Sequence, residues 1–135
     1  MKVNKVVLDT NALLIPGKKG GRDIFSDLEH FLGSYDAIIP SFVVEEVKKL
    51  SEKGRGQTKA AAKLALNQII KKAKIVEANK GQRTVDSAIL SFAQERGAYI
   101  YTNDRGLRDR AKKRNILTIY ISQKKYPKKS RHPKA

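Results

Sequence analysis

The chain has 135 residues, a length that fits one folded domain with a core of its own. It carries 29 Lys and Arg against 13 Asp and Glu, which gives a formal net charge of +16, and it has no cysteine. This composition excludes disulfide frameworks, thiolate metal sites and cysteine nucleophiles, and its charge makes nucleic acid the leading partner.

The positive charge has two other interpretations. A lysine-rich surface also serves solubility, but an excess of one sign this large does not fit interleaved ion pairs. An anionic membrane is a second polyanion, but the chain lacks a basic amphipathic helix with aromatic anchors, and it has no apolar run near the roughly 18 residues that span a bilayer. We therefore expect a cytoplasmic protein that binds nucleic acid and no membrane.

In chain order, short apolar runs bounded by turn residues predict strands, and apolar residues at helical spacing predict helices between them. The predicted elements are a strand over 3–8, a loop over 16–21, a helix over 24–32, a strand over 37–39, a helix over 41–50, a loop over 53–57, a helix over 62–73, a strand over 75–76, a helix over 84–96, a strand over 98–101, a helix after residue 104 and a strand over 116–121. Strands that alternate with helices form a mostly parallel sheet covered on both faces, so the predicted fold class is α/β.

Boundary residues support these elements. Ser41 and Thr84 are the predicted N-caps of their helices, because a hydroxyl there accepts a bond from the first turn. Gly33 and Gly97 are the predicted helix ends.

The C-terminal residues form a basic segment without an acidic residue. We expect a domain over residues 1–122 and a flexible tail over residues 123–135 that helps to hold RNA. A merely solvated terminus explains the composition of the tail equally well.

Four acidic residues stand where predicted strands end or helices begin. Asp9 ends the first strand, Glu46 lies early in the helix after the second, Asp86 lies in the first turn of its helix, and Asp104 follows the strand over 98–101. The carboxyl ends of parallel strands and the following helix N-termini meet at one edge of the sheet, so all four side chains can face one cleft. Clustered carboxylates repel one another unless a cation neutralises them, which predicts a Mg²⁺ or Mn²⁺ site for phosphodiester cleavage.

Each carboxylate also has a plainer interpretation when taken alone. Asp86 and Asp104 stand at helix starts, where capping and the helix dipole favour acids. Asp9 suits a simple Asx turn, and Glu46 suits an exposed position beside Glu45. Their joint placement is what favours a site.

Four segments together resemble the PIN domain family, and the match runs in order from residue 3 to about residue 121. They are Val6-Val7-Leu8-Asp9-Thr10-Asn11, the stretch from Pro40 to Leu50, Thr84-Val85-Asp86, and the stretch from Thr102 to Leu107. The resemblance implies a three-layer α/β/α sandwich with about five strands and Mg²⁺- or Mn²⁺-dependent endoribonuclease activity. It places the acidic metal ligands at Asp9, Glu46, Asp86 and Asp104, with Asn11, Thr102 and Asn103 as supporting polar groups.

Within the family, residues 55–66 resemble the Fcf1-type ribosomal RNA processing branch more than a VapC-like toxin. The first branch implies ribosomal RNA and ribosome-assembly proteins as partners, and the second implies an antitoxin. A non-catalytic RNA-binding assembly factor is a further alternative, and a homodimer is plausible by resemblance. The candidate RNA phosphate contacts are Lys59, Lys63, Arg105 and Arg108.

Overall fold

A sheet with β1 (Asn4–Leu8) at its centre organises the protein, for which the computed structural model describes residues 3–18, 20–121 and 127–129. The strand order is β3-β2-β1-β4-β5-β6. The other strands are β2 (Tyr35–Pro40), β3 (Lys74–Val76), β4 (Tyr99–Tyr101), β5 (Thr118–Ile121) and β6 (Pro127–Lys129). β1 to β5 pair in parallel, which confirms the predicted α/β class and the five strands.

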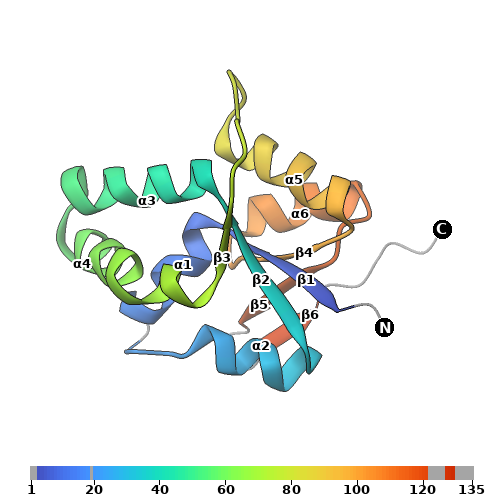
Figure 1. Cartoon of the computed structure of the whole chain (residues 1–135), viewed down its shortest axis with the longest axis horizontal. Coiled ribbons are helices and arrows are strands. Elements are labelled where there is room, and N and C mark those ends of the chain that lie inside the picture. The colour runs from blue at the N-terminus through green and yellow to red at the C-terminus, as the bar shows by residue number, and fades with distance from the viewer. Residues whose placement is uncertain (1–2, 19, 122–126, 130–135) are drawn as a thin grey trace.

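Helices cover both faces of this sheet. They are α1 (Thr10–Lys18), α2 (Ile24–Leu32), α3 (Ser41–Lys53), α4 (Gly56–Leu64), α5 (Val85–Arg96) and α6 (Arg105–Lys113), with a π turn (Ala65–Ile69) and a 3-10 turn (Ile70–Lys72) after α4. Figure 1 shows α1, α3 and α4 on one side of the sheet and α5 and α6 on the other, which is the predicted three-layer sandwich. None of the helices in the described ranges has the length and apolar character to cross a membrane.

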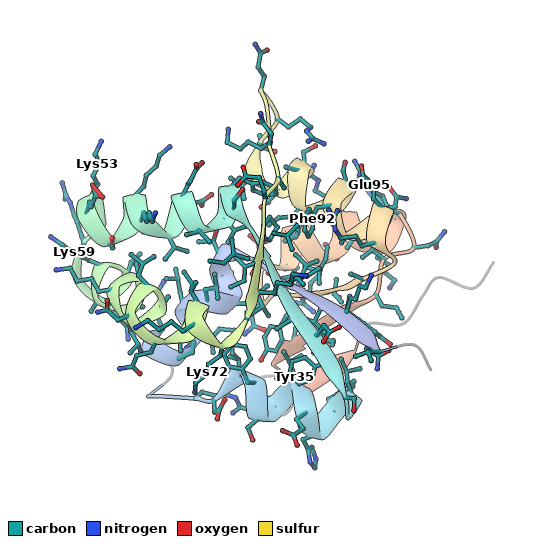
Figure 2. All side chains as sticks on the ribbon, in the orientation of Figure 1. Tyr35, Lys53, Lys59, Lys72, Phe92 and Glu95 are labelled. Carbon is teal, nitrogen blue, oxygen red and sulfur yellow. The ribbon has the colours of Figure 1, made fainter. Side chains whose placement is uncertain are left out.

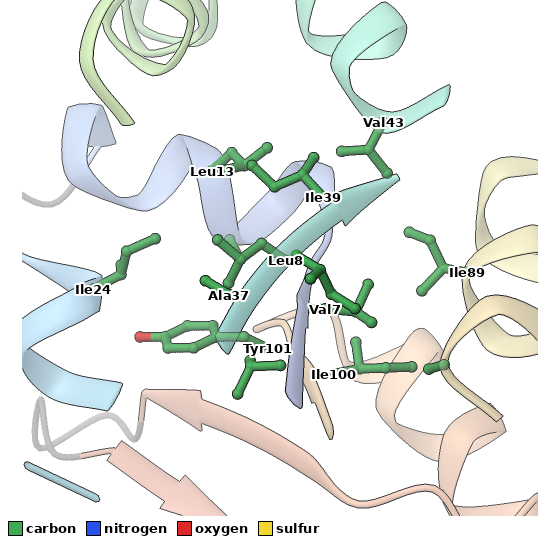
Figure 3. Close-up of a cluster of buried hydrophobic side chains, with 14 of the residues drawn as sticks. Val7, Leu8, Leu13, Ile24, Ala37, Ile39, Val43, Ile89, Ile100 and Tyr101 are labelled. Atoms are coloured by element: carbon green, nitrogen blue, oxygen red, sulfur yellow. The ribbon is translucent and has the colours of Figure 1, made fainter. Parts of the chain in front are cut away.

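Central strands carry the core on both of their faces. Val6, Val7 and Leu8 are fully buried, as expected for a continuous apolar run in a parallel sheet. Figure 3 shows Leu8 on the side of Leu13 from α1, and Val7 on the side of Ile89 from α5. Both layers of helices are therefore anchored on the same three residues of β1.

Helix α1 was missed in the sequence, and the loop predicted from residue 16 was wrong for residues 16–18. Every residue from Ala12 to Pro16 is buried, so the segment has no polar face to reveal a helical period. Asp9 starts this helix: its Oδ1 accepts a bond from the backbone N–H of Ala12 at 2.7 Å.

Two predicted caps have different outcomes. Thr84 caps α5 as predicted, accepting a bond from the Ser87 backbone N–H at 3.1 Å. Ser41 was wrong as an N-cap, because Pro40 holds that position and no side chain caps α3. The Ser41 hydroxyl instead donates to the Ala78 carbonyl at 3.0 Å and accepts from the Ala78 backbone N–H at 2.9 Å. It thereby fixes the segment after β3 to the start of α3.

The sheet also takes in residues that were assigned to a flexible tail. β6 (Pro127–Lys129) pairs with β5 in antiparallel orientation. The other residues of that predicted tail, 123–126 and 130–135, lie outside the described residues.

Helices α1 and α4 cross at very close range. A Cβ added to Gly17 would lie 2.5 Å from the Cα and 2.6 Å from the Cβ of Ala61, distances that real side chains do not adopt. Gly17 is therefore required by the contact between the two helices rather than by a special backbone angle.

We expect Gly17→Ala to lower the free energy of unfolding by about 1–3 kcal/mol, because the added methyl group forces the two helices apart. Urea unfolding monitored by circular dichroism measures this change. Gly106→Ala is the control, since a Cβ there meets only one side-chain oxygen at 3.3 Å. Equal effects of the two substitutions would contradict the close-packing explanation.

Candidate active site

The candidate site lies where the chain leaves the sheet in opposite directions. β1 has β2 on one side and β4 on the other, so the connections after β1 and β4 diverge at the carboxyl edge, which is where ligands bind in open α/β sheets. The backbone N–H of Asn103, after β4, donates to Asn11 Oδ1, after β1, at 2.9 Å. This bond ties the two strand ends that carry Asp9 and Asp104.

Asp9 is the buried member of the site. Only 4% of its surface is exposed. The Thr102 side chain hydrogen-bonds the Asp9 carboxylate, and Thr102 Oγ1 also accepts a bond from the Asp104 backbone N–H at 3.0 Å. Thr102 therefore connects Asp9 to the start of α6.

Asp104 caps α6 and is exposed at the edge of the sheet. Its Oδ1 accepts a bond from the Leu107 backbone N–H at 3.1 Å. The capping interpretation is thus correct for Asp104, and Asp9, for which an Asx turn was the alternative, accepts a similar bond at the start of α1. A cap of this kind occupies one carboxylate oxygen, so the second oxygen of each residue remains compatible with a cation.

Asp86 is not a cap. Thr84 fills that position, and Asp86 stands in the first turn of α5 with its carboxylate 4.0 Å from the guanidinium of Arg110 on α6. Burial, and then the charge of Asp104, raise the pKa of Asp86, while Arg110 lowers it.

Glu46 is half-buried on α3. Burial, and then the charge of Asp86, raise its pKa, and Lys49 and Lys80 act in the opposite direction. The sequence analysis did not select these two lysines or Arg110. Lys49 could have been predicted, because it lies three residues after Glu46 on the same helix. Lys80 and Arg110 could not, because they lie far along the chain from Glu46 and Asp86, respectively.

The charges of the four carboxylates act on one another. Burial is the largest cause that raises the pKa of Asp9 from 3.8 to about 7, and Asp86 and Asp104 add to it. Asp104 also acts on Asp86, and Asp86 acts on Glu46. The four predicted residues therefore form one electrostatically linked group at the carboxyl edge.

This group fits a hydrated cation better than an enclosed one. Across the described ranges, no three acidic or histidine side chains are gathered closely enough to surround a metal ion. Mg²⁺ retains several waters and is often held by one or two carboxylates, and an all-oxygen donor set suits Mg²⁺ and Mn²⁺. The repulsion centred on the buried Asp9 is the property that such an ion would relieve.

The four predicted RNA contacts lie in different settings. Arg105 is exposed and follows Asp104 directly, while the Arg108 guanidinium stacks 3.9 Å from the ring centre of Tyr120. Lys59 is half-buried and Lys63 is exposed, both on α4. Figure 2 shows Lys59 at the outer end of the α3–α4 pair, away from α5.

The chain is similar in sequence to known proteins. A family model described as a PIN like domain matches residues 6–124. Ribonuclease VapC9 of Archaeoglobus fulgidus is 31% identical over 124 residues, which cover 92% of this chain and 87% of the relative. Ribonuclease VapC4 of Methanocaldococcus jannaschii is 32% identical over 126 residues, covering 90% of this chain and 93% of the relative.

Solved structures share the fold. The PIN domain endonuclease Utp24 superposes with a TM-score of 0.70 at 21% identity, over 94% of this chain and 91% of that chain. At this identity the likeness concerns the fold alone.

Asp9 makes stability depend on pH in a defined direction. Its folded-state pKa lies above its unfolded value, so between about pH 4 and pH 7 the folded state keeps a proton that the unfolded chain releases. Without a divalent ion, we expect the contribution of Asp9 to the free energy of unfolding to fall as pH rises through this window, by at most about 4 kcal/mol.

Urea unfolding of the intact protein and of Asp9→Asn isolates this contribution. The measurements are made in EDTA from about pH 4.5 to about pH 8, which covers most of this window. The stability advantage of the native protein over Asp9→Asn should shrink with rising pH, and Mn²⁺ should restore part of it near neutrality. Parallel curves for the two proteins would contradict the assignment.

Proposed function

Because the chain belongs to the PIN-like domain family, we propose that it is a divalent-metal-dependent endoribonuclease that hydrolyses RNA phosphodiester bonds. The observation that carries this proposal is the buried Asp9 carboxylate, whose pKa is raised in part by Asp86 and Asp104 at the same edge. A cation is the natural partner of such a group, and a divalent ion at this edge would assist phosphodiester hydrolysis by activating a water and stabilising charge on the phosphate.

In this proposal, Asp9 and Asp104 anchor Mg²⁺ or Mn²⁺, and Glu46 and Asp86 complete the ligation or orient bound waters. The bound ion supplies an activated water and neutralises charge that develops on the phosphate oxygens. Thr102 keeps the Asp9 carboxylate in place through its hydrogen bond. Asn11 does not contact the ion in this proposal; its side chain accepts a hydrogen bond from the Asn103 backbone and so positions the segment that leads to Asp104.

Arg110 has a related role in the proposal. Its guanidinium lies 4.0 Å from the Asp86 carboxylate and is about half exposed, so it favours the ionised form of Asp86. When ionised, Asp86 is a hydrogen-bond acceptor only, the form in which it would help to hold a divalent ion or its waters.

RNA is the proposed substrate because of the net charge of +16 and the two relatives named as ribonucleases. Arg105, exposed beside Asp104, is placed best to contact a phosphate next to the scissile bond. Arg108 presents the edge of a stacked guanidinium, while Lys59 and Lys63 on α4 suit more distant phosphates.

The relatives also favour a particular biological role. Two proteins named VapC ribonuclease match most of this chain at 31% and 32% identity, whereas the likeness to Utp24 rests on the fold. We therefore place a VapC-like toxin, with an antitoxin as partner protein, ahead of the ribosomal RNA processing role. A cytoplasmic location suits either role.

Metal-dependent cleavage is the direct test of the site. We expect the protein to cut RNA in Mn²⁺ or Mg²⁺ and not in EDTA, and Asp9→Asn and Asp104→Asn to lose at least about 100-fold in rate, because each removes charge from the group that holds the ion. Cleavage of single-stranded and structured RNA resolved on denaturing gels provides the rates.

Glu46 and Glu45 form a matched pair for the same assay, since they are neighbours on α3 and only Glu46 is coupled to Asp86. Glu46→Gln should slow cleavage at least about tenfold, and Glu45→Gln should leave it within about twofold. Tight RNA binding without cleavage by the intact protein would instead support a non-catalytic RNA-binding factor.

The toxin role predicts an effect on cells. Induced expression should arrest growth through loss of cellular RNA, and Asp9→Asn, which lacks a metal ligand, should permit growth at equal protein level. Growth curves with quantified protein provide the measurement. Unimpaired growth alongside active cleavage in vitro would return the ribosomal RNA processing role to first place.

A further inference from the structure

A cavity with a mostly basic lining lies at the amino edge of the sheet, away from the four carboxylates. Its volume is about 670 Å³, and it is lined by four cationic side chains and a single carboxylate. The five residues are Lys5, Lys72, Lys74, Arg96 and Asp36. Figure 2 shows Lys72 and, from the same lining, Tyr35 near the lower end of the sheet, opposite the edge from which α3 departs.

The sheet register explains how these residues come together. Lys5 on β1 pairs with Asp36 on β2, and Lys74 on β3 pairs with Ile38 on β2. Register partners in a parallel sheet point to the same face, so Lys5, Asp36 and Lys74 share one face. Arg96, at the end of α5, closes the cavity on that face.

Within the described residues, no ion pair neutralises the three lysines of the lining, whereas Arg96 lies 3.7 Å from the exposed carboxylate of Glu95. The Arg96 guanidinium stacks 3.6 Å from the ring centre of Phe92 and donates to the Phe92 carbonyl at 3.2 Å. The mutual repulsion of the lysines is relieved by an anion that contacts several of them at once.

Protection of a sheet edge does not explain this set. Lysines on an edge strand prevent pairing with other chains, and Lys74 on β3 suits that role. Lys5, however, lies on the central strand and Arg96 lies on a helix, so neither protects an edge. The lining is instead that of a site for a phosphate-bearing ligand.

We propose that this amino-edge cavity is a second RNA-backbone site, which holds a part of the substrate remote from the bond that is cut. The inference rests on the proposed function for the identity of the ligand. β2 has six residues and runs from the cavity to the carboxyl edge, about 20 Å. A single RNA strand covers this distance with about three to six nucleotides, depending on how far it is extended, so an RNA of about 20 nucleotides can occupy both sites at once.

The test measures the affinity of the full chain for RNA by fluorescence anisotropy in EDTA, with oligonucleotides of about 6 and about 20 nucleotides chosen around that span. Lys72→Gln with Lys74→Gln should weaken binding of the longer RNA about tenfold and make its salt dependence shallower by about two contacts. The shorter RNA, which cannot bridge the two sites firmly, should bind the intact protein more weakly than the longer RNA does.

A double substitution on the opposite flank is the matched control. Lys112→Gln with Lys113→Gln removes the same charge from two exposed neighbours at the end of α6. Equal losses in both double variants would reduce the effect to overall charge and overturn the proposal, as would no loss in the Lys72 and Lys74 pair. Asp36→Asn removes the carboxylate of the cavity and should strengthen binding of the longer RNA about threefold, a gain that misfolding cannot produce.

Cleavage by the intact protein, run in parallel, separates this proposal from the proposed function. Suppose that the intact protein cleaves RNA and that the Lys72→Gln, Lys74→Gln double variant binds the longer RNA as tightly as the intact protein. This result would overturn the second site and leave the proposed nuclease function unaffected. Length-dependent loss of binding without any cleavage would overturn the nuclease and support the second site. Displacement of the longer RNA by polyglutamate at equal charge would assign the cavity to an acidic peptide and overturn the RNA proposal.

Discussion

Burial of the Asp9 carboxylate at the end of the central strand is the constraint on which the rest of the site depends. An ionised carboxylate in that position loses most of its hydration, and the charges of Asp86 and Asp104 add repulsion to this cost. The backbone N–H of Ala12 and the Thr102 side chain compensate in part, and these bonds also start α1 and align the start of α6. The same interactions therefore shape the fold locally and leave a carboxylate that a cation would stabilise.

A group of acidic side chains and a group of basic side chains lie at opposite edges of the sheet. Four carboxylates gather at the carboxyl edge of a chain with more than twice as many cations as acids, and basic side chains surround the amino-edge cavity. A polyanion approaching such a surface is attracted everywhere except at the acidic group, where bound cations would reverse the local repulsion. RNA binding and metal binding would thus be linked, since each makes the other more favourable.

Much of this architecture was predictable from the sequence, for reasons that individual residues make clear. The parallel strands were readable because buried strands are apolar on both faces, and Thr84 and Gly97 marked the ends of α5 by their own chemistry. Helix α1 was not readable, because burial on all sides removes the polar face that reveals a period. The contact between Asp86 on α5 and Arg110 on α6 joins residues that are far apart in the sequence, so no short-range pattern predicts it.

Ser41 shows how such a long-range contact shapes the site. Its hydroxyl hydrogen-bonds both the carbonyl and the N–H of Ala78, 37 residues away. These two bonds connect the segments that follow β2 and β3 much as a backbone pair connects two strands. Glu46 lies little more than one helical turn after Ser41, and Lys80 lies two residues after Ala78. The hydrogen bonds between Ser41 and Ala78 therefore help to fix the positions of Glu46 and Lys80 relative to each other. A change in the loop between Ala78 and the start of α5 would therefore reach Glu46 mainly through Lys80, while the Ser41 hydroxyl keeps the base of the loop attached to α3.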